Sequence, residues 1–189
     1  MRTLIVSVCL LCVGCSQGYT HFDHPIVDER GYRVDPSLVG RWAVELEPEA
    51  GDEAERIPDV SISPDGEVTF EMPPGEPGKD LKLERLRLVT ARIGNDTFAS
   101  LQTGESGHDT WAYFRYWMPE PGVVSYASDS TRFWKDAVRN KMVSGVIETT
   151  STGEGTTVTA SEAELRAFVL GYGRVIFADE ELGRLRRLK

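Results

Sequence analysis

Short segments of β-forming residues, separated by turn residues, run through most of this 189-residue chain and constrain its fold more than any other feature. The clearest is a hairpin, in which residues 60–63 and 67–72 alternate apolar with polar residues around the turn sequence Pro64-Asp65-Gly66. Strands and helices do not alternate along the chain, so a parallel sheet is disfavoured and an antiparallel barrel or sandwich is expected. Further strands are predicted at residues 38–46, 81–93, 97–103, 110–118, 123–128, 144–149 and 156–159.

Two segments late in the chain have helical spacing instead. Residues 130–142 place their apolar residues on one face, which is typical of an amphipathic helix. Ser161 and Glu164 form a capping box that begins a second helix, and we expect Gly171 and Gly173 to end it. The fold class is therefore mainly β with two helices that cover an open end or a side of the barrel, and residues 182–188 form a last short strand or a frayed helix.

A short motif at the start of the first predicted strand refines this architecture. The Gly40-Arg41-Trp42 sequence resembles the Gly-x-Trp element of lipocalin-like barrels. In that family the glycine lets the chain bend into the barrel, and the tryptophan fills the base beneath an arginine of the last strand. The resemblance thus implies a small lipocalin-like barrel in which Arg184, Arg186 or Arg187 stacks on Trp42.

The three cysteines all lie within the first fifteen residues. A basic start is followed by an apolar run over residues 4–13, which is too short to cross a bilayer as a helix because that needs ~20 residues, but fits a secretory signal. The sequence Leu11-Cys12-Val13-Gly14-Cys15 that ends it resembles the lipobox of bacterial lipoproteins. That resemblance implies cleavage before Cys15, acylation of Cys15 with palmitate-like chains and, with Ser16 next, delivery to the outer membrane with the domain facing the periplasm.

The lipobox divides the chain into three parts. Residues 1–14 are a cleaved signal peptide, residues 15–37 are the acylated cysteine and a tether, and residues 38–189 are one β-rich domain. Because the domain then has no cysteine, it must be stable without disulfides and offers neither a thiol nucleophile nor a cysteine-based zinc site. Its acidity, with a net charge of −9 for the whole chain, argues against a nucleic-acid-binding protein.

The most aromatic strand, residues 110–118, is the best candidate for a binding surface. One face carries Ala112, Phe114, Tyr116 and Met118, and the other carries Trp111, Tyr113, Arg115 and Trp117. We expect the uncharged face to line the barrel and a helix to cover the other. The alternative is that Arg115 points inward as an anchor for a carboxylate. The candidate ligand-binding residues are Trp42, Phe114, Tyr116 and Arg115.

Three polar clusters are weaker candidates for chemistry. Residues 104–109 contain Ser, His and Asp, but triad members meet from distant segments rather than side by side. The two histidines of residues 21–24 lie in the expected tether, and the acidic run at 45–55 lacks the spacing of a calcium loop. We therefore expect no catalytic residue, no metal, no cofactor and no enzymatic activity.

The sequence thus predicts an envelope lipoprotein that binds a small apolar or amphipathic molecule in a β-barrel. The alternative is a structural or accessory lipoprotein that contacts another envelope protein.

Overall fold

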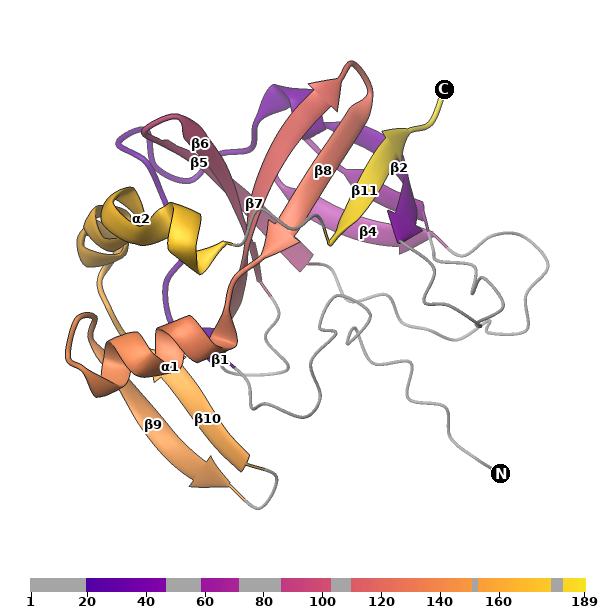
Figure 1. Cartoon of the computed structure of the whole chain (residues 1–189). Coiled ribbons are helices and arrows are strands. Elements are labelled where there is room, and N and C mark those ends of the chain that lie inside the picture. Colours follow the sequence, from indigo (N-terminus) through magenta and orange to yellow (C-terminus); the bar gives the residue numbers. More distant parts are fainter. Residues whose placement is uncertain (1–19, 47–58, 72–85, 103–109, 151–152, 178–181) are drawn as a thin grey trace, which may run out of the picture.

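The computed structural model describes residues 20–46, 59–71, 86–102, 110–150, 153–177 and 182–189 (Figure 1). In these residues the chain is mainly β with two α-helices, which confirms the expected fold class. Eight of the strands form a closed antiparallel barrel. They are β2 (Gly40–Leu46), β3 (Asp59–Ile62), β4 (Glu67–Glu71), β5 (Leu86–Ile93), β6 (Asp96–Gln102), β7 (Trp111–Glu120), β8 (Val123–Ser128) and β11 (Gly183–Arg187).

Each barrel strand pairs with the next one along the chain, and β11 closes the barrel because it pairs with both β8 and β2. The predicted hairpin is β3 and β4, whose turn contains Gly66 at a φ of +90°. Within residues 182–188, for which the sequence predicts a short strand or a frayed helix, Gly183–Arg187 form the closing strand β11.

A second layer packs on the outside of the barrel. There, β1 (Thr20–Phe22) pairs in parallel with β10 (Gly153–Val158), which pairs in antiparallel fashion with β9 (Gly145–Thr150). The helix α1 (Thr131–Arg139) lies across β9 and β10, and α2 (Glu162–Ile176) lies beside β5 and β6 (Figure 1). The helices therefore cover a side of the barrel.

The alternation of side chains along the strands creates two separate hydrophobic cores. The inner core lies inside the barrel and includes Trp42, Leu88 and Tyr116. The outer core, between the barrel wall and α1 and α2, includes Phe98 and Trp134. Strand β7 contributes to both, since Tyr113 lies in the outer core and Tyr116 in the inner one.

The expected tether is wrong for residues 20–37, which belong to the folded unit. Strand β1 lies in this segment, and Phe22, Ile26 and Val27 are buried in the outer core. The contacts that hold the segment are long-range: the backbone N–H of Ile26 donates to Ser100 Oγ at 2.9 Å, for example. A stretch with no periodicity of its own is thus ordered by partners that are distant in the sequence.

Two predicted element ends are also wrong. Helix α2 continues past Gly171 and Gly173 to Ile176. A Cβ on Gly173 would lie 3.3 Å from the ring of Phe98, so this glycine allows the helix to approach the barrel rather than ending it. Strand β7 continues through Pro119 to Glu120, where an irregular register between Trp117 and Glu120 accommodates a residue that lacks an N–H group.

Candidate functional site: the barrel interior

One end of the barrel is filled by the Gly-x-Trp element. A short 3-10 helix, η2 (Pro36–Leu38), precedes β2, and Trp42 is 1% exposed beneath it. The indole Nε1 of Trp42 donates to the carbonyl oxygen of Leu38 at 2.8 Å, so its polar group is paired. We call this the sealed end and the opposite one the far end.

Arg187 of the last strand completes the sealed end. Its guanidinium carbon lies 4.4 Å from the centroid of the Trp42 ring, which confirms the expected contact for one of the three candidate arginines. The guanidinium also donates to the carbonyl oxygens of Ser37 at 2.6 Å and Val39 at 3.0 Å. Gly40 has a φ of +138°, and a Cβ there would lie 2.8 Å from Arg187 Nη1, so both the backbone and the space favour glycine.

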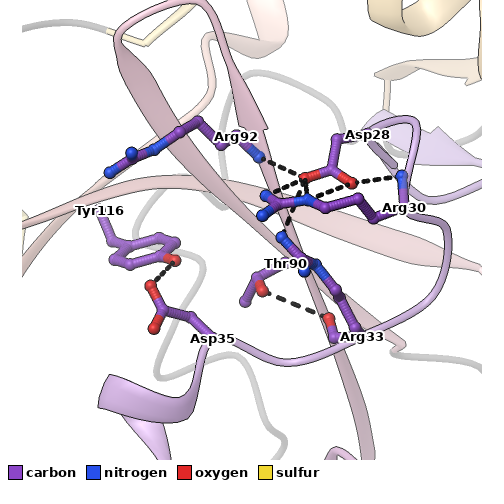
Figure 2. Close-up of polar contacts among 7 residues, drawn as sticks. All are labelled: Asp28, Arg30, Arg33, Asp35, Thr90, Arg92 and Tyr116. Atoms are coloured by element: carbon purple, nitrogen blue, oxygen red, sulfur yellow. Dashed lines mark hydrogen bonds and ion pairs between the residues drawn. The ribbon is translucent and has the colours of Figure 1, made fainter.

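The segment of residues 23–35 crosses from the outer core to the sealed end and is held on β5 by polar contacts (Figure 2). Asp28, at 7% exposed, accepts hydrogen bonds from the backbone N–H groups of Arg30 and Arg92. It also pairs with the guanidinium groups of Arg30 and Arg33. Burial alone would raise the pKa of Asp28, but the hydrogen bonds from Arg30 and Arg92 and the Arg30 charge outweigh it and lower the pKa.

The same segment reaches the inner core through Asp35. The hydroxyl of Tyr116 donates to Asp35 Oδ2 at 3.0 Å (Figure 2). The backbone N–H and the hydroxyl of Ser37 donate to the other carboxylate oxygen. Burial would raise the pKa of Asp35, but the hydrogen bonds from Ser37 and Tyr116 lower it overall. Burial and the neighbouring Asp35 carboxylate raise the pKa of Tyr116 well above its usual value.

The two faces of β7 divide as expected. Phe114 and Tyr116 belong to the inner side, while Trp111 and Tyr113 lie in the outer core, where Tyr113 contacts Trp134 of α1. Arg115 is paired in register with Phe98, an outer-core residue, and its guanidinium carbon lies 5.2 Å from the centroid of the Trp117 ring. Of the four candidate ligand-binding residues, Trp42, Phe114 and Tyr116 therefore share the barrel interior, and Arg115 lies on the outer wall.

Toward the far end the inner wall is less completely buried. Five inward-facing apolar side chains there pack on the inner core but keep part of their surface accessible to solvent. They come from β2, β4, β7, β11 and the residue just before β11, so they lie on several parts of the wall rather than at one spot. They are Val44, Phe70, Phe114, Leu182 and Leu185.

Tyr126 of β8 is the functional candidate that sequence reasoning missed. It faces Tyr116 in the register of β7 and β8, and its ring meets that of Phe114 edge-on at 6.0 Å between centroids. Its hydroxyl is buried and has no hydrogen-bond partner among the described residues. Burial raises the pKa of Tyr126 to about 12, so the group is a neutral phenol. The alternation of residues 123–128 places Tyr126 on the inner face, but no sequence signal shows that its hydroxyl lacks a partner.

The remaining candidates do not form a second site in the described part of the chain. His21 lies on β1, and the carbonyl oxygen of His24 accepts a hydrogen bond from the Tyr113 hydroxyl. No group of three or more His, Cys, Asp or Glu side chains among the described residues is placed to hold a metal ion. Residues 104–109 and most of the acidic run, like Cys15, lie outside the described residues.

No described helix is both long and apolar enough to cross a membrane. Comparison with known proteins found no matching protein family, no matching curated protein and no matching solved structure.

Proposed function

We propose that this chain is a lipid-anchored protein of the bacterial envelope whose barrel binds a small apolar or amphipathic molecule without catalysing a reaction. The observation that carries the proposal is the difference between the two barrel ends. The sealed end is filled by Trp42 and Arg187 with their polar groups paired, whereas inward apolar side chains toward the far end remain partly accessible. Binding sites for small molecules are typically concave and lined by apolar and aromatic side chains.

Ligand binding is tested by titrating the full chain with the neutral fluorescent dye N-phenyl-1-naphthylamine. We expect saturable binding that is lost in Phe114→Gln, which places an amide on the inner wall. Arg115→Gln is the matched control because the neighbouring side chain lies on the outer wall, and it should bind as the wild type does. Absence of saturable binding by the wild type, or equal loss in both variants, would refute binding in the barrel. Mass spectrometry of the natively purified protein would then identify any retained molecule.

The location rests on the lipobox, with Cys15 as the acylated residue and the periplasmic side of the outer membrane as the destination. Several acyl chains are needed for stable anchoring, since a single chain gives only marginal membrane binding. Metabolic labelling with palmitate should mark the wild type and Cys12→Ser but not Cys15→Ser. An unlabelled wild type would remove the anchor from the proposal.

A second candidate function is an accessory role in contact with another envelope protein. It is favoured by apolar side chains on the solvent face of α2, where Leu170 is 66% and Val175 is 64% exposed. A photo-crosslinking residue at Leu170 should then yield a discrete adduct in intact cells, while the same residue at Arg132 on α1 should not. If neither position gives an adduct, the accessory role has no support at this surface.

A further inference from the structure

The Tyr126 hydroxyl, which has no hydrogen-bond partner among the described residues, bears on the chemistry of the ligand, and this step rests on the proposed function of the barrel. A buried hydroxyl without a partner is unfavourable, because it has lost its hydrogen bonds to water and gained none from the protein. The neighbouring inward side chains do not compensate for that loss. Tyr116 donates to Asp35, Phe114 is apolar, and Gly183, the register partner of Tyr126 on β11, has no side chain. A ligand that reaches this depth can therefore supply the missing partner.

The charges around Tyr126 exclude one class of polar group. Arg92 of β5 acts electrostatically on Tyr116, but the Asp35 carboxylate beside Tyr116 already offsets its charge. Among the described inward positions of β7, β8 and β11, Arg187 is the only charged residue. Its guanidinium lies at the sealed end, where it is held by the carbonyl oxygens of Ser37 and Val39 and by the ring of Trp42. Arg115, Arg184 and Arg186 occupy the alternate, outward positions. An anionic group next to Tyr126 would thus lose its hydration without gaining a counter-charge.

We infer that the barrel binds an amphipathic molecule whose polar end is uncharged, such as an alcohol, ester or amide, and that this end forms a hydrogen bond with the Tyr126 hydroxyl. A phenol both donates and accepts, so it can pair with a carbonyl or with a hydroxyl group. The interior therefore selects against a carboxylate of the same chain length. Arg115 does not offer an inward anchor for a carboxylate, because it lies on the outer wall.

The test compares three probes that differ only in the polar end: decanol, methyl decanoate and decanoate at pH 8. Each competes with N-phenyl-1-naphthylamine for the full-length wild type, for Tyr126→Phe and for Tyr172→Phe. The last is the matched control, since Tyr172 is an exposed residue of α2 that contributes nothing to the barrel interior. Tyr126→Phe removes a hydroxyl for which the described residues offer no partner, so the variant is expected to fold, and its thermal midpoint is measured in parallel.

We expect the wild type to bind decanol and methyl decanoate about tenfold more tightly than decanoate. Tyr126→Phe should weaken binding of the two neutral probes about fivefold to tenfold and change decanoate binding less, while Tyr172→Phe should change nothing. Displacement by decanoate as strong as by the neutral probes, or equal affinities in the wild type and Tyr126→Phe, would overturn the inference and leave barrel binding standing. If no dye binds the wild type at all, both the inference and the proposed function are wrong.

Discussion

The two ends of the barrel are built from the same strands but differ in whether their buried polar groups have hydrogen-bond partners. At the sealed end the indole of Trp42, the guanidinium of Arg187 and the hydroxyl of Tyr116 all have partners within the chain. Toward the far end, inward apolar side chains remain partly accessible, and the buried hydroxyl of Tyr126 has no partner in the described part of the chain. Buried polar groups with hydrogen-bond partners stabilise a fold, whereas a buried polar group without one is tolerated where a ligand can supply the missing partner. We therefore expect substitutions at the sealed end to lower stability and those toward the far end to alter binding.

Trp42→Ala should have the largest effect. Removing a fully buried tryptophan leaves a cavity at the sealed end, so the free energy of unfolding should fall by about 3–5 kcal/mol. The half-buried Phe114 of the same inner core gives the comparison, and Phe114→Ala should lower stability by no more than about 2 kcal/mol. Urea denaturation followed by far-ultraviolet circular dichroism measures both. Equal losses would mean that both ends contribute alike to stability.

Asp28→Asn should have the next largest effect, and a pH-dependent one. The asparagine cannot replace the charged hydrogen bonds to Arg30 and Arg33, so stability at pH 7 should fall by about 2 kcal/mol. The pKa of Asp28 is lower in the folded than in the unfolded chain, so its stabilisation is present above the unfolded pKa of 3.8 and is lost as the pH falls below it.

The measurement for Asp28 is the difference in unfolding free energy between wild type and Asp28→Asn at a series of pH values. The difference should be constant from pH 7 to pH 5 and shrink toward zero below pH 4. A difference that stays the same down to pH 3 would show that the carboxylate charge does not hold the segment of residues 23–35 on β5.

The sealed end also shows what the sequence could predict. The hairpin β3–β4 and the two faces of β7 are encoded locally, by alternation and by turn residues. The contact between Trp42 and Arg187 joins residues far apart in the chain. It was predictable because the resemblance of the Gly-x-Trp motif to lipocalin-like barrels implies an arginine of the last strand on the tryptophan. Choosing Arg187 among three arginines required the register of β11 with β2, in which Arg187 faces Trp42.

Features that depend on non-local partners and belong to no recognisable motif could not be predicted. The segment of residues 23–35 has no apolar periodicity, and its order comes from Ser100, Arg92 and Tyr116, which are all contributed by barrel strands. Gly173 lies inside α2, where its lack of a side chain leaves room for Phe98 of β6. The usual association of glycine with helix ends takes no account of such a neighbour. The unpaired hydroxyl of Tyr126 is likewise a property of its neighbours and not of its own position in the sequence.

Arg187→Leu should reduce the free energy of unfolding by less than Trp42→Ala or Asp28→Asn. It removes two hydrogen bonds to backbone carbonyls and the contact with Trp42, but the side chain is largely solvent-exposed, so a loss of about 1–2 kcal/mol is expected. The matched control is Arg186→Leu on the same strand, which removes only an exposed ion pair with Glu45 and should change stability by no more than about 0.5 kcal/mol. Thermal denaturation of the two variants distinguishes them, and identical midpoints would contradict the role of Arg187 in the sealed end.

The smallest effects are expected from the two tyrosines that face each other between β7 and β8. Replacing each by phenylalanine compares a hydroxyl that has a partner with one that has none among the described residues. Tyr116→Phe removes the hydrogen bond to Asp35 and should lower the free energy of unfolding by about 1 kcal/mol. Tyr126→Phe removes a buried hydroxyl that has no partner among the residues the structure describes, so the free energy of unfolding should stay the same or rise by about a few tenths of a kcal/mol. Urea midpoints of the two variants, measured without ligand, give the difference directly. If Tyr126→Phe is as destabilising as Tyr116→Phe, then the Tyr126 hydroxyl already has a hydrogen-bond partner in the ligand-free protein. It would then not be available to bind the polar end of a ligand.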